Sequence, residues 1–250
     1  AKQELFDRWQ GENNATVTLT IKKDKALKTD GFRLGKNSVQ AITDIGILYG
    51  VYELLRHQQT GESIKKDEVD NPSYEVRILD HWDNLNGTVE RGYAGNSIFW
   101  RKEDPFTVTE KDKTLWQQYA RANASIGINA SVLDNVNASP LILSTDYLSR
   151  AKDIANVLRP YGIKVYLAVN FASPSTLGKL KTADPLDAEV ISWWKNKVKE
   201  IYSLIPDFGG FLVKASSEGQ PGPQNYGRTH ADGANMMADA LKPYGGIVMW

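Results

Sequence analysis

The sequence contains no cysteine and only three histidines among its 250 residues. Without cysteine, the chain can form neither a disulfide framework nor a thiolate metal site. With only His57, His81 and His230, we do not expect a multi-histidine zinc centre, and we expect neither a metal nor another cofactor. The chain also lacks a Walker loop and the His-Glu-x-x-His and Gly-x-Ser-x-Gly motifs. No Gly-x-Gly-x-x-Gly follows a predicted strand, which argues against a dinucleotide site.

Excess charge and long apolar runs are missing as well. The 30 Lys and Arg residues balance the 30 Asp and Glu residues, so the formal net charge is zero. Electrostatic binding of nucleic acid needs clustered excess base, so we expect no nucleic-acid partner. No apolar run approaches the ~18 residues of a transmembrane helix, so we expect no membrane partner.

Tryptophan is the residue type that stands out, with seven copies. Sugar-binding enzymes use indole rings as platforms for their substrates, although large cores use them too.

At ~150 residues per domain, 250 residues make fewer than two average domains, although a single α/β barrel can also take this length.

Residues 1–73 predict a small α+β N-terminal domain. Polar and apolar residues alternate over 16–21, which is typical of a half-buried strand, and residues 32–34 and 39–42 are further short strands. From Asp44 the apolar residues take helical spacing, and Gly61 stands where a helix C-cap is expected. Residues 61–73 are polar, end in Asn-Pro-Ser, and read as a linker.

Residues 74–250 alternate between strand and helix patterns. Short apolar strands are predicted at 76–79, 131–133, 165–169, 211–213 and 247–250. Helices are predicted to begin at Thr109, Thr145, Asp184 and Thr229. The first of these helices would turn Leu115, Tyr119, Ala122 and Ile126 inward. Such alternation predicts a parallel sheet covered by helices.

Polar and aromatic groups follow four successive strands, and in barrels the chemistry lies at the carboxyl ends of the strands. We therefore expect an α/β fold of the (β/α)8 TIM-barrel type rather than an open, doubly wound sheet. Only about the first five of the eight strands are present, so 74–250 would be the N-terminal part of a catalytic barrel. An exposed fifth strand would leave an unpaired edge, so we expect either more protein beyond residue 250 or a partner that covers this edge.

Lys214 and Glu218 are the strongest candidates for chemistry. The predicted strand is apolar up to Val213, so Lys214 lies at its end and Glu218 in the following loop. A carboxylic acid at this rim could protonate a leaving oxygen if an apolar wall keeps it protonated. Lys214 could bind an anionic group of a substrate, although a lysine beside Glu218 also favours the ionised carboxylate. The alternative is a solvated ion pair.

Three further groups could bind a sugar. At His81, Trp82 and Asp83, the indole face suits a sugar ring and the flanking polar groups suit its hydroxyls. Asn135 and Asn137 could also bind hydroxyls. The alternatives are a core tryptophan and turn-forming polar residues, which would show the same patterns. Arg228 and His230 combine an anion binder with a proton carrier, although Thr229 and Asp232 also explain this segment as a helix start. The candidate ligands in these groups are His81, Trp82, Asp83, Asn135, Asn137, Arg228 and His230.

Six contiguous segments together resemble the glycoside hydrolase family 67 α-glucuronidases, in the same order along the chain. They are residues 78–84 (ILDHWDN), 90–99 (ERGYAGNSIF), 159–165 (RPYGIKV), 170–174 (NFASP), 206–215 (PDFGGFLVKA) and 226–235 (YGRTHADGAN). Residues 15–61 resemble, more loosely, the latter part of the family's N-terminal domain.

The resemblance implies a (β/α)8 enzyme that releases glucuronic acid, or its 4-O-methyl ether, from the terminal xylose of xylo-oligosaccharides, with inversion. It implies that Glu218 is the general acid, that Lys214 binds the sugar carboxylate and that Trp82 is a wall of the uronic-acid pocket. An anionic sugar would explain why a cation neighbours the acid. We expect any homodimer to form through parts of the parent chain that are not present here.

Inversion also requires a second carboxylate, about 6.5–9.5 Å from the acid. In the family this base comes from barrel strands beyond the fifth. We therefore expect an internal fragment of an α-glucuronidase that holds the acid but not its base.

Two other functions stay open on the sequence. A glycosidase with substrate-assisted chemistry would place an adjacent Asp-Glu pair at the fourth strand end, where this chain has Ser217 and Glu218. A non-catalytic remnant that binds uronic acids or other carbohydrates is the third hypothesis.

Overall fold

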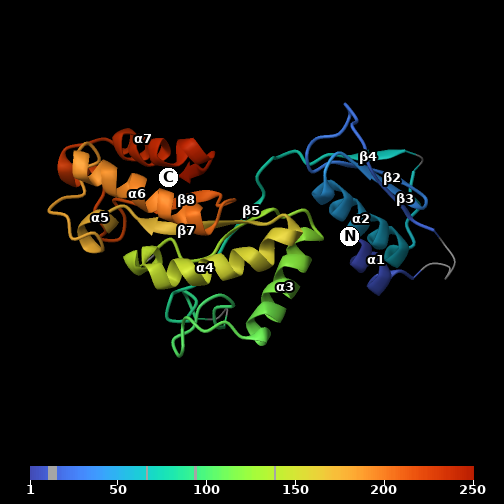
Figure 1. Cartoon of the computed structure of the whole chain (residues 1–250), viewed down its shortest axis with the longest axis horizontal. Helices are drawn as coiled ribbons and strands as arrows, with labels where there is room; N and C mark the ends of the chain where they lie inside the picture. Colours follow the sequence, from blue (N-terminus) through green and yellow to red (C-terminus); the bar gives the residue numbers. More distant parts are fainter. Residues whose placement is uncertain (11–15, 66, 93–94, 138) are drawn as a thin grey trace. The chain divides into compact units, whose positions relative to one another are not determined.

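The computed structural model describes residues 1–10, 16–65, 67–92, 95–137 and 139–250, which form two units (Figure 1). The first unit comprises Ala1–Arg77 together with Tyr119–Asn129. The second comprises Ile78–Gln118 together with Ala130–Trp250. Each unit has its own sheet. Within the described ranges, no helix combines the length and the apolar character needed to cross a membrane.

The first unit is built on a four-stranded mixed sheet in the order β1-β3-β2-β4. Strand β1 is parallel to β3, whereas β2 is antiparallel to both β3 and β4. Its elements are α1 (Lys2–Arg8), β1 (Thr18–Ile21), β2 (Phe32–Gly35), β3 (Ser38–Ala41), α2 (Asp44–Thr60) and β4 (Glu68–Asp70).

Helix α2 covers this sheet at close range. The Thr43 side chain accepts a hydrogen bond from the backbone N–H of Gly46 and caps the helix, which ends at Gly61 with a φ of 71°. A Cβ on Gly50 would lie 2.3 Å from Cγ1 of Val39 in β3, so only glycine permits this approach. The predicted α+β character of the N-terminal region is confirmed.

The prediction that residues 61–73 form a linker is wrong in part. Residues Glu68–Asp70 form β4 and pair with β2, with Arg33 opposite Val69. A three-residue edge strand that is mostly exposed carries no apolar pattern in the sequence. Only its distant partner strand determines its structure.

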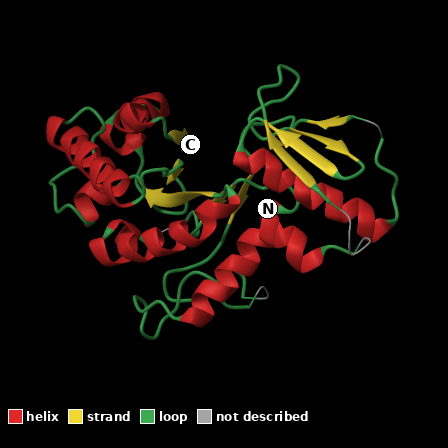
Figure 2. Cartoon of the chain, turned by 45° about the vertical axis from the view of Figure 1, so that its right-hand side comes forward, coloured by secondary structure: helices red, strands yellow, loops and turns green. Residues whose placement is uncertain are grey.

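The second unit is built on a five-stranded parallel sheet in the order β5-β6-β7-β8-β9, with helices between successive strands (Figure 2). The strands are β5 (Ile78–Asp80), β6 (Ala130–Val132), β7 (Lys164–Asn170), β8 (Gly210–Lys214) and β9 (Ile247–Met249). The α-helices of this unit are α4 (Thr145–Leu158), α5 (Ser173–Thr176), α6 (Ala188–Leu204) and α7 (His230–Leu241), and α3 (Glu110–Ala124) belongs to it as far as Gln118. Four 3₁₀ turns complete the connections: η1 (Pro140–Leu143), η2 (Arg159–Tyr161), η3 (Pro223–Tyr226) and η4 (Lys242–Tyr244).

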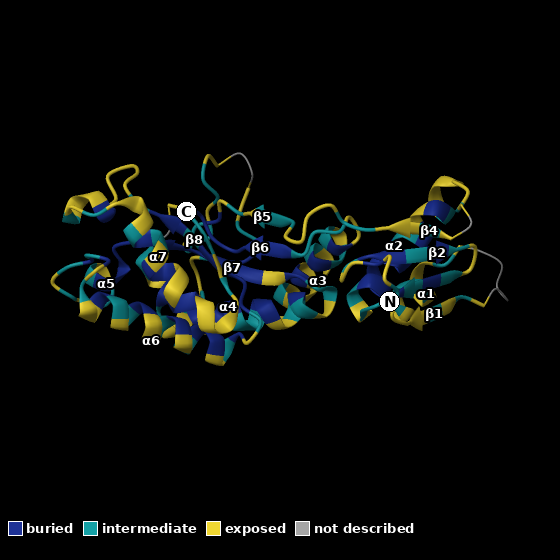
Figure 3. Ribbon diagram, turned by 90° about the horizontal axis from the view of Figure 1, so that it is seen from above, coloured by how far each residue is buried: buried dark blue, intermediate teal, exposed yellow. Residues whose placement is uncertain are grey.

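The strands of this sheet bury residues on two faces (Figure 3). On one face Val132, Tyr166 and Ala168 cluster with Leu212 and Met249, their neighbours in register. The alternate residues face the helices, and Trp194 of α6 packs edge-on against Phe211 of β8 at 5.7 Å between ring centroids. Burial on both faces explains why the central strand β7 is almost continuously apolar.

The structure therefore shows a parallel, curled five-stranded α/β sheet preceded by a separate mixed sheet. The predicted order of strands and helices in residues 74–250 is confirmed at this level.

The predicted start of α6 at Asp184 is wrong by three residues. Asp187 is the N-cap, and its Oδ1 accepts hydrogen bonds from the N–H groups of Glu189 and Val190 at 2.8 and 3.2 Å. An Asp-Pro pair suits a turn as well as a helix start, and Asp184 instead accepts from the Leu186 N–H in such a turn.

The predicted buried face of α3 is also wrong. Leu115 is 40% exposed, whereas Trp116 is fully buried and its Nε1 donates to the Ile98 carbonyl at 2.7 Å. Two helical stripes one residue apart are possible in this segment. The larger indole and its hydrogen bond to the loop decide which stripe turns inward.

Candidate active site

The carboxyl ends of the parallel strands bring together several residues that are distant in the sequence. Asn170 ends β7 opposite Lys214, which ends β8, and Asp134 follows β6. Asp134 also reaches across to the next strand, because its Oδ1 accepts from the Ala168 N–H at 2.9 Å. These contacts place the polar strand ends in one neighbourhood.

Lys214 lies at the centre of this group. Its side chain is only 7% exposed, and its Nζ donates to Glu218 Oε2 at 2.6 Å and to Asn137 Oδ1. A buried ammonium group requires such acceptors because it has lost its water shell. Three predicted site residues are therefore in direct contact.

The loop that carries Glu218 has an uncommon backbone. Ser216 and Glu218 have φ values of 53° and 51°, in the left-handed region that non-glycine residues rarely adopt. Gly222 lies so close to Ser216 that a Cβ on it would come within 1.8 Å of the serine Oγ. This conformation presents a 65% exposed carboxylate beside a buried lysine.

Glu90 is connected to Lys214 through Asn137. Its Oε2 accepts from the amide nitrogens of Asn135 at 2.6 Å and of Asn137 at 2.9 Å. These bonds, the first of them above all, and the charges of Arg91 and Lys214 lower the pKa of Glu90. The connection of Glu90 to Lys214 through Asn137 is a finding of the structure.

Asn135 joins the loop after β6 to the loop after β5. Its backbone N–H donates to the Asp83 carbonyl at 2.8 Å, and its side-chain nitrogen also donates to Asn84 Oδ1 at 3.1 Å. Its Oδ1 accepts from the Asn137 N–H at 2.9 Å, which holds the turn between the two asparagines.

Trp82, His81 and Asp83 follow β5. Trp82 is 41% exposed, and the Arg91 guanidinium lies 5.5 Å from the centroid of its ring. Asp83 is buried and accepts from Ser97 Oγ at 2.5 Å, while its other oxygen lies 3.8 Å from His81 Nδ1. Asp83 and His81 therefore interact with each other and with their own loop.

Asp134 is a functional candidate that the sequence pattern did not single out. It is buried, and its Oδ2 has no hydrogen-bond partner among the described residues. Burial above all, with the charges of Asp80 and Asp83, raises the pKa of Asp134 well above its usual range. Its position directly after a buried strand was the available signal.

A hollow of about 480 Å³ lies among the loops after β5 and β6, and neither Lys214 nor Glu218 lines it. Its lining includes Asp83, Asn84, Arg101, Lys102, Asp134, Asn135 and Asn137. Amide and carboxylate groups of this kind suit the hydroxyls of a sugar.

Arg228 and His230 belong to a different group of contacts. Arg228 binds both oxygens of Asp184 through Nε at 3.0 and 3.2 Å, and its hydrogen bond is the main cause that lowers the pKa of Asp184. His230 Nδ1 accepts from Trp250 Nε1 at 2.9 Å. Within the part of the chain that the structure describes, these hydrogen bonds do not join Arg228 or His230 to Lys214 or Glu218. Their role as substrate ligands stays a prediction.

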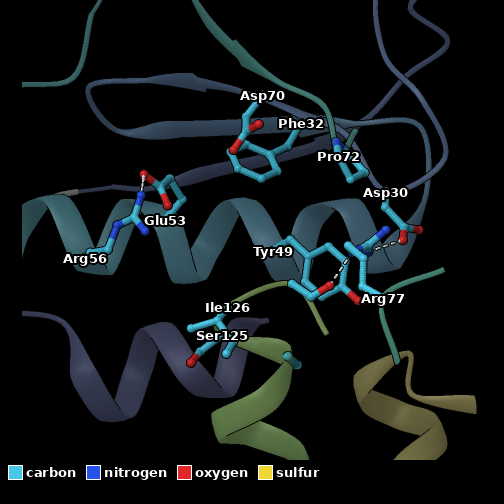
Figure 4. A pocket seen from close by; sticks show the side chains of 12 residues that line it. Asp30, Phe32, Tyr49, Glu53, Arg56, Asp70, Pro72, Arg77, Ser125 and Ile126 are labelled. Atoms are coloured by element: carbon cyan, nitrogen blue, oxygen red, sulfur yellow. Dashed lines mark hydrogen bonds and ion pairs between the residues drawn. The ribbon is translucent and has the colours of Figure 1, made fainter. Parts of the chain in front are cut away.

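A second hollow, of about 300 Å³, lies within the first unit (Figure 4). Arg77 pairs with Asp30 at 2.6 Å and Arg56 pairs with Glu53, so most charges around it are neutralised locally. None of the predicted site residues lines it. Its charges are therefore explained by the packing of α2 and the neighbouring turns.

The described residues contain no cluster of three or more His, Asp or Glu side chains arranged to hold a metal ion.

Two solved structures share the fold of this chain. The chain aligns over 98% of its length with 40% of a GH138 enzyme targeting pectin rhamnogalacturonan II, with a TM-score of 0.57 and 16% identity. It aligns equally fully with 58% of a β-N-acetylhexosaminidase from Bacteroides fragilis, with a TM-score of 0.55 and 13% identity. At these identities the likeness concerns the fold alone.

Closer relatives match in sequence. The chain is 48% identical over 229 residues to a probable alpha-glucuronidase A of Neosartorya fischeri and 45% identical over 234 residues to an alpha-glucuronidase of Hypocrea jecorina. Each match covers 90% of this chain but only 27% of the relative, so the chain spans about a quarter of their length. The model of the glycosyl hydrolase family 67 middle domain matches residues 57–250. The chain therefore belongs to glycosyl hydrolase family 67.

Proposed function

We propose that this chain carries the acid-bearing part of an inverting α-glucuronidase. The whole enzyme would release glucuronic acid, or its 4-O-methyl ether, from xylo-oligosaccharides on a complete (β/α)8 barrel. The observation that carries the proposal is the Lys214–Glu218 pair at the carboxyl end of β8, in a chain of family 67. The names of the relatives agree with this activity.

The pair suits an anionic sugar. A uronic acid differs from a neutral sugar by its carboxylate, and Lys214 offers a buried positive charge to bind it. Glu218 is exposed at the rim, where it can reach the glycosidic oxygen and deliver a proton to the departing xylose. Trp82 offers a partly exposed ring nearby on the loop after β5.

Inversion requires a second carboxylate that activates water about 6.5–9.5 Å from the acid, on the opposite face of the sugar. We infer that this base comes from the part of the full-length protein that lies outside this chain. The first product formed from the α-linked substrate would then be the β-anomer of the uronic acid, which proton NMR of the fresh reaction detects. Initial formation of the α-anomer would contradict inversion.

Replacing Glu218 by glutamine in the full-length protein tests the acid role. We expect the release of 4-O-methylglucuronic acid from aldouronic acids to fall by about 10²–10⁴-fold in kcat, because the leaving xylose needs a proton. A 4-nitrophenyl α-glucuronide needs little protonation, so its hydrolysis should fall by less than about tenfold. The matched control is Glu189→Gln, at an exposed glutamate in the first turn of α6.

The two substrates separate the possible outcomes. Near-normal turnover of aldouronic acids by Glu218→Gln would show that Glu218 is not the acid. Equal losses on both substrates would contradict proton donation to the leaving group and indicate a binding or folding role.

A further inference from the structure

A chain of polar contacts runs from Glu90 through Asn137 to Lys214. Glu90 Oε2 accepts from Asn137 Nδ2 at 2.9 Å, and Asn137 Oδ1 in turn accepts from Lys214 Nζ. Lys214 then meets Glu218 at 2.6 Å. A residue of the loop after β5 is thus connected to the lysine at the end of β8.

Glu90 and Lys214, which lie on either side of Asn137 in this series of contacts, determine the orientation of the Asn137 amide. An ionised carboxylate only accepts hydrogen bonds and an ammonium group only donates them, whereas the amide has one accepting and one donating end. With Glu90 on one side and Lys214 on the other, the nitrogen must face Glu90 and the oxygen must face Lys214. A flipped amide would oppose oxygen to carboxylate and N–H to ammonium.

Glu90 is itself held in place. Its backbone N–H donates to the Trp82 carbonyl at 2.9 Å, and a β-bridge pairs its neighbour Val89 with Asp83. Its Oε2 also accepts from Asn135 Nδ2 at 2.6 Å. The hydrogen bond from Asn135, more than any other interaction, lowers the pKa of Glu90, which keeps the carboxylate charged.

We propose that Glu90 is a positioning residue that acts through Asn137 to hold the Lys214 ammonium group where it binds the carboxylate of the sugar. This inference rests on the proposed function. Without Glu90 the Asn137 amide can rotate, and Lys214 loses an oriented acceptor on one side. The ammonium group is then drawn toward Glu218 alone.

Kinetics of the full-length protein test the role. In Glu90→Ala we expect KM for an aldouronic acid and the inhibition constant of free glucuronic acid to rise about tenfold, since a hydrogen bond to a charged group is affected. We expect kcat to stay within about twofold, because uniform binding is lost rather than transition-state stabilisation. Inhibition by xylobiose, which has no carboxylate, should not change. Glu103→Ala, at an exposed glutamate of the same loop, is the control.

A double-mutant cycle separates positioning from direct contact with the sugar. If Glu90 acts through Asn137, Glu90→Ala should cause no further loss in an Asn137→Ala background. If Glu90 binds the sugar itself, the two losses should add. The conservative Glu90→Gln provides the same cycle if the alanine variant does not fold.

The failure of this inference and the failure of the proposed function are distinguishable. A wild-type protein that releases no uronic acid contradicts the proposed function. An active wild-type with additive losses, or with unchanged KM in Glu90→Ala, contradicts only the positioning role.

Discussion

Lys214 and Glu218 form an ion pair in which one partner is buried and the other is exposed. Nζ and Oε2 are 2.6 Å apart, yet the lysine side chain is 7% exposed and the glutamate side chain 65%. If the pair separates, water can solvate the exposed carboxylate of Glu218. The buried ammonium group of Lys214 has no comparable access to water. A second carboxylate that enters the site can therefore take over the lysine at low cost to Glu218.

Replacing Lys214 by methionine in the full-length protein should remove the selectivity for an acidic sugar. We expect kcat/KM for an aldouronic acid to fall about 100-fold, because the sugar carboxylate then enters without a partner. The measurement is steady-state kinetics together with the inhibition constant of glucuronic acid. Lys164→Met is the matched control, since Lys164 is exposed at the start of β7. Unchanged inhibition by glucuronic acid in Lys214→Met would show that this lysine does not bind the carboxylate.

Asp134→Asn in the full-length protein should change how stability depends on pH. Because the pKa of Asp134 is raised mainly by burial, the folded state keeps a proton that the unfolded chain releases above about pH 4. The contribution of Asp134 to stability is therefore complete below that pH and is lost as the pH rises through the raised folded-state pKa. Asparagine can still accept from the Ala168 N–H but does not titrate.

We expect the free energy of unfolding of Asp134→Asn to gain on that of the wild type as the pH rises from about 4 to about 8, in urea titrations. Asp239→Asn, at an exposed aspartate of α7, is the control. Parallel pH profiles for wild type and Asp134→Asn would mean that Asp134 is ionised in the folded protein.

Paired substitutions in α3 test which face of that helix is buried. We expect Trp116→Ala to cost about 3–5 kcal/mol, because a fully buried indole and its hydrogen bond to Ile98 are lost. We expect Leu115→Ala to cost less than about 1 kcal/mol, because that side chain is 40% exposed. Calorimetric unfolding of the full-length variants measures both. A reversed order would restore the sequence-based stripe.

Local patterns predicted much of the second unit. Thr229 and Asp232 form the expected capping box of α7, with Thr229 Oγ1 accepting from the Asp232 N–H at 3.2 Å. The sequence also predicted the apolar strand β7 and the presence of helices on either side of it, because periodicity and caps depend on neighbours in the sequence. Strand β4 and the α6 cap at Asp187 were missed, because a distant strand and a competing turn decided them.

The site shows the same contrast between features that depend on sequence neighbours and features that depend on distant segments. Lys214 and Glu218 are four residues apart at the end of an apolar strand, and this spacing is visible in the chain itself. The contact of Lys214 with Asn137 crosses from β8 to the loop after β6, and that of Asn137 with Glu90 crosses to the loop after β5.

The sequence by itself determined the strand-helix alternation, the neutral charge balance and the placing of a lysine and a glutamate at one strand end. These follow from residue types and short-range spacing. Only the tertiary structure decided that Glu90 supports Lys214, that Asp134 is buried with a raised pKa and that Trp116 rather than Leu115 enters the core. The reason is physical: burial and amide orientation depend on which segments the parallel sheet brings side by side, and no local pattern encodes that neighbourhood.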